Sequence, residues 1–281
     1  VVIAGALTSA GGGDINIEAT LGSAPTRTIE VGADITANGG GVTLVALDGL
    51  SVTPGTNPTI QGQAGTITGN VAGNGGDVLL DFASDLTLNG GNVSDVHNLT
   101  RTGGGDTFVS GEIVTTGFQH YLSGNIVLQA DTTFAGTDLS FAGTVTGAHV
   151  LTVGQTGTPT ASATFQDDVS VNRLIVTAQV GDFALLGNTT ISSTNPTTFS
   201  NTGVLTLGGD STDTISFGGN VTATAPSRVE LGGTVSVPKS PSRSLTLGNV
   251  SLLADTTLSG ATGSFTTMSG NGFALTLDFG G

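Results

Sequence analysis

A gapless internal repeat constrains the fold of this chain more than any other feature. Residues 124–153 align with residues 248–277 at an offset of 124 residues, and 12 of the aligned positions are identical. A weaker copy of the same pattern lies between them, over residues 185–208. Self-similarity of this kind indicates a repeat architecture, in which similar units stack on one another, and not a closed globule.

The N-terminal third carries a shorter unit of its own. The sequence Gly-Gly-Asp-Ile-Asn-Ile at residues 12–17 is echoed at residues 39–44 and again at residues 75–80. The spacings are irregular, but they fall in the range of one or two turns of a solenoid. We therefore expect one β-solenoid over residues 1–281, with Gly-Gly-Asp-type rungs over residues 1–115 and degenerate longer repeats over residues 116–281.

Residue usage favours strands over helices. Short runs alternate between apolar and polar residues, as in Leu86-Thr87-Leu88 and Leu245-Thr246-Leu247, and Gly, Asn or Asp separates the runs. β-Branched residues pack well on pleated sheets, and the 46 glycines suit the sharp corners of stacked rungs. Aromatic residues make up only 5% of the chain, which argues against a β-sandwich. The expected fold is an all-β, right-handed parallel β-helix of roughly 12 rungs.

Charge and composition exclude several classes of protein. Six Lys and Arg residues against 21 Asp and Glu give a formal charge of −15, which leaves no basic surface for nucleic acid. No apolar run approaches the ~18 residues of a membrane-spanning helix. The chain has no cysteine, so disulfides and thiolate zinc sites are excluded. Residues 1–7 do not form an intact signal peptide, and we interpret the chain as a processed or internal piece of a longer protein.

The repeat units resemble those of a known bacterial family. Gly-Gly-Asp-Ile-x-Ile, the stretch Gly-Asn-Ile-Val-Leu-Gln-Ala-Asp-Thr-Thr-Phe at residues 124–134, and Ser-Phe-x-Gly-x-Val-Thr at residues 140–146 and 216–222 are similar to units of filamentous-haemagglutinin-type exoproteins. The β-helical adhesive shafts of autotransporter passengers look similar. The resemblance implies an exported surface adhesin or filament whose repeats are structural, and it supplies no catalytic residue to carry over.

The most acid-dense stretch contains Asp77, Asp81 and Asp85, spaced four residues apart. An outward Asp81 could share a Ca²⁺ ion with a neighbouring rung. Residues 73–79 and 103–108 are similar to calcium-binding nonapeptides, but neither is repeated in tandem. We therefore interpret these residues as turn and surface groups, and we expect no metal and no cofactor.

The remaining polar residues suggest no catalytic constellation. His97, His120 and His149 lack the spacing of a ligand set, and no Gly-x-Ser-x-Gly elbow is present. Isolated arginines could contact a carboxylated glycan, but we interpret them as surface residues: Arg27, Arg101, Arg173, Arg228 and Arg243. Pairs of Thr residues could form a ladder that binds ice, but their irregular spacing predicts that they do not stack: Thr26/Thr28, Thr66/Thr68, Thr144/Thr146, Thr212/Thr214 and Thr222/Thr224.

The sequence predicts a non-catalytic, structural or adhesive shaft of an extracellular or cell-surface bacterial adhesin or fibre. The alternatives are a glycan-active β-helix enzyme, which would place two carboxylates or an acid and a base on adjacent rungs of one face, and a passive glycan-binding module. Expected partners are further rungs of the same chain, head-to-tail copies, and host or matrix glycans or proteins. The repeat alignment also predicts that Phe141 and Phe265 occupy equivalent inward positions.

Overall fold

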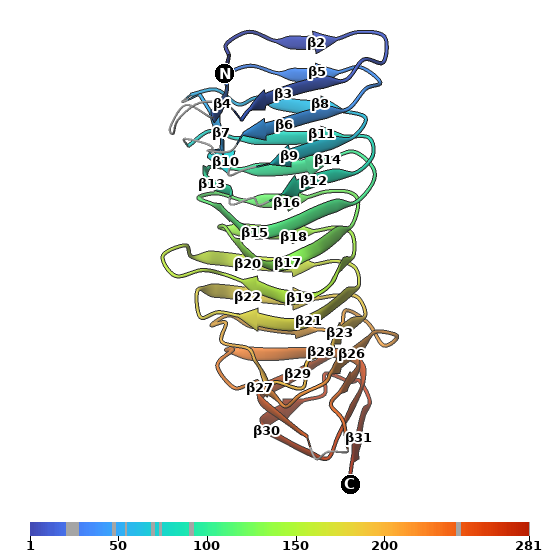
Figure 1. Cartoon of the computed structure of the whole chain (residues 1–281). Coiled ribbons are helices and arrows are strands. Elements are labelled where there is room, and N and C mark those ends of the chain that lie inside the picture. The colour runs from blue at the N-terminus through green and yellow to red at the C-terminus, as the bar shows by residue number, and fades with distance from the viewer. Residues whose placement is uncertain are drawn as a thin grey trace. The chain divides into compact units, whose positions relative to one another are not determined.

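The structure is a computed structural model that describes residues 1–20, 28–46, 49–53, 55–68, 71–72, 75–89, 93–239 and 243–280. All regular secondary structure in these residues is β, with 31 strands and no helix (Figure 1). The strands pair in parallel and stack as a β-solenoid of about 11 turns, close to the 12 expected. The predicted fold class is therefore confirmed.

The chain divides into two compact units, which we call unit 1 (Val1–Ala142) and unit 2 (Gly143–Gly281). The strands of unit 1 are β1 (Val2–Ile3), β2 (Leu7–Ser9), β3 (Ile15–Ala19), β4 (Thr28–Val31), β5 (Ile35–Ala37), β6 (Val42–Ala46), β7 (Gly49–Val52), β8 (Thr59–Gly62), β9 (Gly65–Thr68), β10 (Val71–Ala72), β11 (Val78–Phe82), β12 (Leu86–Asn89), β13 (Val93–Val96), β14 (Leu99–Thr102), β15 (Thr107–Thr115), β16 (Gln119–Tyr121), β17 (Ile126–Ala135) and β18 (Asp138–Phe141).

The strands of unit 2 are β19 (Val145–Val153), β20 (Thr160–Phe165), β21 (Val169–Val176), β22 (Val180–Leu185), β23 (Thr189–Ile191), β24 (Thr197–Thr198), β25 (Val204–Leu207), β26 (Thr214–Phe217), β27 (Val221–Ala223), β28 (Arg228–Ser236), β29 (Ser244–Gly260), β30 (Thr262–Ser269) and β31 (Leu275–Phe279).

Inward side chains form continuous columns because each strand pairs in register with strands one turn away. In unit 1, the strands β5, β8, β11 and β14 lie side by side (Figure 1), and their inward residues continue into β16 and β18. This column consists of Ile35, Ile60, Leu80, Arg101, Tyr121 and Phe141. All six residues are buried, and the rings of Tyr121 and Phe141 stack with centroids 5.1 Å apart.

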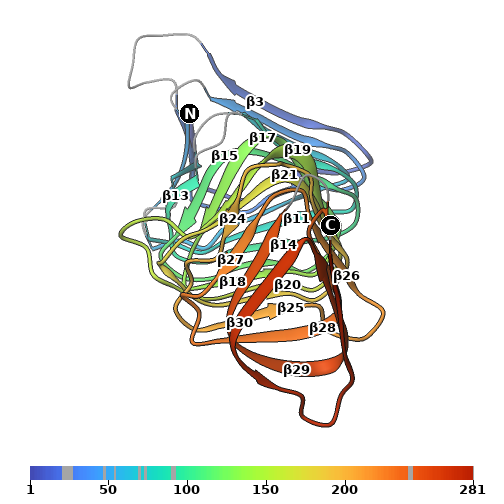
Figure 2. The same ribbon diagram turned by 90° about the horizontal axis from the view of Figure 1, so that it is seen from below.

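Unit 2 packs its core around a series of phenylalanines from successive turns. The ring of Phe183 lies between those of Phe165 and Phe199, at centroid distances of 5.7 and 6.0 Å, and Phe217 follows Phe199 at 6.0 Å. Strands of this unit run across the lower part of Figure 2. These four phenylalanines form an aromatic part of the core although the chain has few aromatic residues, because a stack of rings needs only one ring in each turn.

The long repeat is equivalent in its first half. Thr132 and Thr256 are both buried, and their hydroxyls donate to the carbonyl oxygens of Ala130 and Ala254 at 3.0 and 2.9 Å. In both copies the threonine hydroxyl thus bonds to the carbonyl oxygen two residues before it, so the chain has the same local conformation at this position.

The expectation for the second half of the repeat is wrong in one respect. Phe141 is fully buried, whereas Phe265 is 37% exposed. Both residues face a buried register partner, Tyr121 and Leu247 respectively. However, β30 pairs only with β29 within the described residues, so no further strand covers Phe265.

Asp and Asn side chains at strand ends connect successive turns. In unit 1, Asp14 accepts the backbone N–H of Gly41 and Asp34 accepts that of Thr59. In unit 2, Asn188 donates its backbone N–H to Asp168, and its own side-chain oxygen accepts the N–H of Thr214. Much of the acidic composition thus serves as hydrogen-bond acceptors between turns, at positions where the ladder of strand hydrogen bonds has ended.

Candidate functional site

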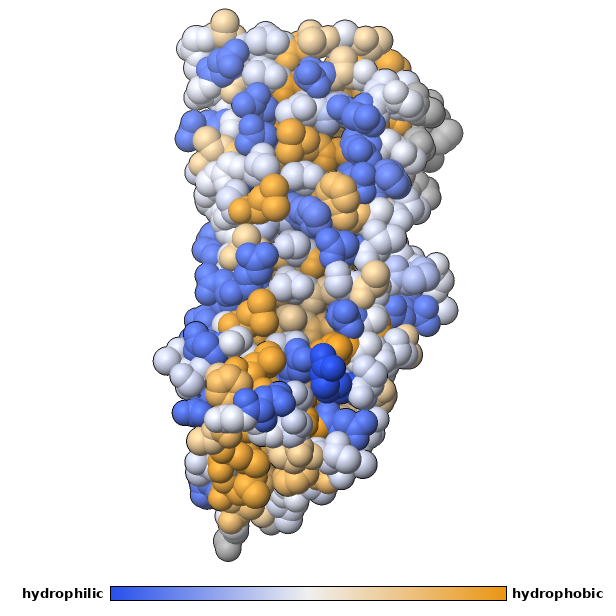
Figure 3. Space-filling model, turned by 180° about the vertical axis from the view of Figure 1, so that it is seen from behind, coloured by the Kyte–Doolittle hydropathy of each residue, from blue (hydrophilic) through white to orange (hydrophobic). Residues whose placement is uncertain are grey.

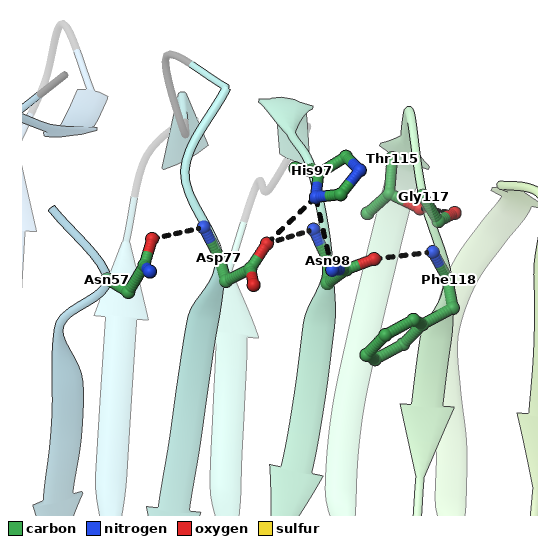
Figure 4. A network of polar contacts seen from close by, with 7 residues as sticks. All are labelled: Asn57, Asp77, His97, Asn98, Thr115, Gly117 and Phe118. Carbon is green, nitrogen blue, oxygen red and sulfur yellow. Dashed lines mark hydrogen bonds and ion pairs between the residues drawn. The ribbon is translucent and has the colours of Figure 1, made fainter. Parts of the chain in front are cut away.

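The longest described series of these acceptors runs along one corner of unit 1 (Figure 4). Asn57 Oδ1 accepts the N–H of Asp77 at 3.1 Å, Asp77 Oδ1 accepts that of Asn98 at 3.1 Å, and Asn98 Oδ1 accepts that of Phe118 at 3.0 Å. Asp77, Asn98 and Phe118 directly precede β11, β14 and β16, and Asn57 lies two residues before β8. The same corner therefore repeats once per turn over these four strands. We call this series the corner ladder.

His97 adds an imidazole to the corner ladder. Its Nδ1 atom lies 3.1 Å from Asp77 Oδ1 and 3.1 Å from Asn98 Nδ2. The Nδ1–H tautomer and the protonated ring donate to the carboxylate, whereas the other tautomer accepts from the amide. The side chains of His97 and Asp77 are 54% and 47% exposed, so a ligand in solution can reach both.

A groove of about 410 Å³ lies beside the corner ladder. We call it the ladder groove, and its lining residues are Asn57, Thr59, Asp77, Val78, Leu79, Asn98, Thr100, Thr102 and Phe118. The Phe118 ring stacks on His120, with centroids 4.2 Å apart and planes 20° apart. His120 Nε2 is in turn 2.8 Å from Asp138 Oδ2, which anchors the apolar end of the groove.

The structure separates the three acids that the sequence analysis grouped. Asp77 belongs to the corner ladder, while Asp81 on β11 accepts from Gln61 Nε2 at 3.2 Å and from Thr102 Oγ1 at 3.0 Å. Asp85 accepts the N–H of Asp106 at 3.0 Å. In the described part of the chain, no three His, Cys, Asp or Glu residues are grouped so as to hold a metal ion.

The first of the two calcium-like stretches, residues 73–79, begins with residues 73 and 74, which lie outside the described residues. In the other, Asp106 accepts the amide of Asn125 at 2.9 Å and so joins two turns.

Arg101 corrects one interpretation, because it is a core residue and not an isolated surface cation. Its side chain is 1% exposed and occupies the inward column of β14. The guanidinium donates to the carbonyl oxygens of Phe82, Ser84 and Gly104 at 3.2, 3.1 and 2.8 Å, and to Thr107 Oγ1 at 3.1 Å.

Burial lowers the pKa of the Arg101 guanidinium, and the nearby carboxylates of Asp81 and Asp85 oppose that shift. The alternation Leu99-Thr100-Arg101 was the available signal for its inward position. The turn that follows it requires glycine, since Gly103 has φ +91° and a Cβ there would collide with the backbone of Phe82.

The other candidate arginines do not converge on a site. Arg228 pairs with Glu230 at 2.6 Å on the surface of unit 2, whereas Arg27 lies outside the described residues. Arg173 lines a separate surface cavity with Thr198 and Ser200.

One further cavity, of about 240 Å³ in unit 2, has two carboxylates in its lining. They are Asp182 on β22 and Glu230 on β28, and β25 with Thr206 lies between these two strands. Asp182 Oδ1 accepts the N–H of Val204 at 2.7 Å, and Glu230 Oε1 accepts two hydrogen bonds from Arg228. No sequence motif connects these two carboxylates, because β22 and β28 are separated by more than 40 residues and share a face only through the stacking of β22, β25 and β28.

The Thr residues stack more than their spacing suggested. Thr66 pairs in register with Thr43 and Thr87, and Thr214 begins a column that continues through Thr234 and Thr257. The other members of these pairs do not form matching columns: Thr68 is opposite Val45 and Asn89 in register, and Thr212 lies outside the strands. Neither of these two pairs therefore stacks as a pair, in agreement with the expectation, although single Thr residues do form columns. Thr26 lies outside the described residues.

No protein-family model, curated protein or solved structure matches this chain. Among the described residues, no helix has the length and apolar character needed to cross a bilayer. The fold itself is a β-solenoid, which is consistent with a β-helical adhesin-type protein.

Proposed function

We propose that the chain is a structural and adhesive shaft of a secreted or cell-surface bacterial protein, similar to filamentous-haemagglutinin-type exoproteins, and that it catalyses no reaction. The repeat motifs of the sequence and the parallel stacking of the strands support this proposal together. An extracellular location is part of the proposal, because the resemblance is to exported proteins.

The observation that carries the proposal is the use of polar side chains between turns. Asp14, Asp34, Asp77, Asp85 and Asp168 each accept a backbone N–H from a neighbouring turn. A catalytic carboxylate must instead be directed at a substrate. A chain that uses its acids in this way is built to extend a stack of rungs.

The proposed partners include further rungs and copies of the chain stacked end to end. Exposed apolar side chains on β1, β2 and β31 support this part, namely Val2 at 65%, Leu7 at 38% and Leu277 at 51% exposure. Figure 3 shows strongly hydrophobic residues gathered at the lower end of the view, while hydrophilic residues are spread over most of that face. Stacking of copies that does not close on itself gives a fibre.

Surface display tests the shaft directly. The chain would be anchored to the outside of a bacterial cell with an epitope tag at its free end, and cells would be scored for antibody binding and for attachment to matrix-coated plates. We expect tag exposure and increased attachment relative to cells that carry the anchor alone. Cells that expose the tag without any gain in attachment would contradict the adhesive part, and electron microscopy of the purified chain would test for end-to-end fibres.

The cavity with Asp182 and Glu230 favours one alternative, a glycan-active enzyme. Paired carboxylates on one face can act as acid and base on a glycosidic bond. Incubation with a panel of polysaccharides, followed by assays for reducing ends and for unsaturated uronates, decides between the two functions. We expect no turnover, whereas turnover that Asp182→Asn and Glu230→Gln abolish would replace the shaft with an enzyme.

A further inference from the structure

The ladder groove is lined by apolar and polar groups that lie side by side. Leu79 and the Phe118 ring, backed by His120, provide a half-buried apolar surface. Asn57 and Asp77 provide an amide and a carboxylate at the corner (Figure 4). Thr59 and Thr100 are the register partners of Leu79 and provide hydroxyl groups on either side of it. A ligand that fits must itself have an apolar face and a polar edge, which is the chemistry of a pyranose ring with its axial C–H bonds and its hydroxyls.

The polar groups of the ladder groove retain free hydrogen-bonding capacity. The corner ladder uses Oδ1 of Asp77 and Oδ1 of Asn57, but Oδ2 of Asp77 and the amide nitrogen of Asn57 make no hydrogen bond with a described residue. The hydroxyls of Thr59 and Thr100 likewise have no partner among the described residues. The ladder therefore fixes these side chains in position and leaves both donors and acceptors for a ligand.

The charge of the groove limits the ligand class. No Lys or Arg is among the lining residues, Asp77 lies on the groove and Asp81 lies beside it on β11. Arg101 lies on β14 between the lining residues Thr100 and Thr102, but it is buried and directs its guanidinium at carbonyl oxygens in the core. An anionic glycan would meet uncompensated carboxylates, so the groove favours an uncharged one.

The groove also crosses the corner from β8 to β16, which are three rung spacings apart. At ~4.8 Å per rung this is about 14 Å, the span of a short oligosaccharide and not of one sugar. We propose that the ladder groove binds a segment of an uncharged polysaccharide along the stacking direction, with Phe118 stacking on a sugar ring and Asp77, Asn57, Thr59 and Thr100 bonding its hydroxyls. This site deepens the proposed adhesive function by naming the ligand class.

Affinity electrophoresis in native gels tests the site with defined probes. The full chain would be run in gels containing glucomannan, xyloglucan, dextran or hydroxyethylcellulose, and in gels containing heparin or alginate. We expect retardation in at least one neutral gel and none in the anionic gels. Phe118→Ala should weaken that binding by about tenfold, because a ring stack is lost. Thr100→Val should weaken it by about threefold or more through loss of one hydroxyl.

Matched controls separate binding from folding. Leu122→Ala truncates another apolar side chain of unit 1, 53% exposed and absent from the groove lining, and should leave the retardation unchanged. Thermal melting of every variant identifies any that fail to fold. If Phe118→Ala does not fold, Thr100→Val still tests the site, because valine has nearly the same shape as threonine and only the hydroxyl is lost.

Three outcomes would overturn the ladder groove as a glycan site: no retardation of the folded chain in any neutral gel, equal retardation of all variants, or displacement by an unstructured peptide at concentrations that leave free sugar ineffective. Retardation only in heparin or alginate would overturn the uncharged ligand. None of these outcomes changes the surface-display result or the absence of turnover, so failure of the groove is distinguishable from failure of the shaft.

Discussion

Arg101 is the only charged side chain among the fully buried residues of the described chain, and its surroundings explain why it is retained. Its guanidinium joins carbonyl oxygens from two successive turns, those of Phe82 and Ser84 on one and Gly104 on the other. Phe82 is the last residue of β11, and Ser84 and Gly104 lie in the turns that follow β11 and β14. The cation replaces, at one corner, the hydrogen bonds that the strands provide elsewhere.

Replacing Arg101 should therefore destabilise the fold strongly. We expect Arg101→Ala to reduce the free energy of unfolding by roughly 3–5 kcal/mol, since it leaves buried carbonyls without donors. Arg228→Ala is the control, because its side chain is 52% exposed and its surface pair with Glu230 is worth about 1 kcal/mol or less. Urea denaturation of the two variants measures both quantities, and similar losses would show that the Arg101 bonds contribute little.

Tyr121, the single tyrosine, predicts how stability changes at alkaline pH. Burial raises the pKa of its phenol above the ordinary value of 10.0. A group with a raised folded pKa contributes stability below its unfolded pKa and loses it as the pH rises further. Above pH ~10 the free energy of unfolding should therefore fall by up to about 1.4 kcal/mol per pH unit.

Ultraviolet difference spectra provide the measurement, because tyrosinate absorbance should appear only together with unfolding. Tyr121→Phe should lack both the signal and this part of the alkaline loss. Ionisation of Tyr121 while the chain remains folded would contradict its burial.

Predictions for single residues were correct where a sequence pattern repeated, and they failed where the position of a residue depends on one contact between turns. Alternation correctly indicated inward Leu86 and Leu88, both nearly fully buried. It could not indicate the ladder groove, because the corner residues Asn57, Asp77 and Asn98 are spaced 20 or 21 residues apart and resemble ordinary turn residues. Their convergence depends on the register of the stack, which short degenerate repeats do not fix.

Among whole elements, the two copies of the long repeat differ in what covers them. Phe141 lies under its neighbours in unit 1, whereas the equivalent Phe265 on β30 is partly exposed. The sequence therefore predicted that both segments form strands. It did not predict how deeply each phenylalanine is buried, because that depends on whether another strand covers it on each side.

This difference predicts unequal costs for the same truncation. Phe141→Ala should cost about 3–5 kcal/mol, since it opens a cavity in a packed aromatic cluster, and Phe265→Ala should cost about 1 kcal/mol. Chemical denaturation of both variants provides the comparison. Equal costs would indicate that Phe265 is covered in solution.

The hydrogen bonds between turns predict a local effect in unit 2. Asn188→Ala removes the acceptor for the N–H of Thr214 and should cost about 1 kcal/mol, while Asn188→Asp keeps an acceptor and should cost less. Amide hydrogen exchange gives the specific readout: the Thr214 amide should exchange faster in Asn188→Ala. Unchanged exchange at Thr214 would show that the bond does not protect this turn.

For the molecule as a whole, the dispersal of its acids predicts independence from metal ions. The acids of the 77–85 stretch bond to protein groups on different turns. We expect that EDTA leaves the Tm unchanged to within about 1 °C, because a ligand that does not bind the native state cannot stabilise it. A drop of several degrees, reversed by added Ca²⁺, would show that the stretch binds calcium after all.

Parallel stacking has a consequence for the export that we propose for this chain. In each unit a strand pairs with strands one turn before and one turn after it, as β11 does with β8 and β14. Each completed turn is therefore the template for the next, and no segment has to wait for a distant one. A chain delivered from its N-terminus through a narrow pore could fold as it emerges. The folded turns outside would be too wide to slip back, so folding itself would make the passage one-way.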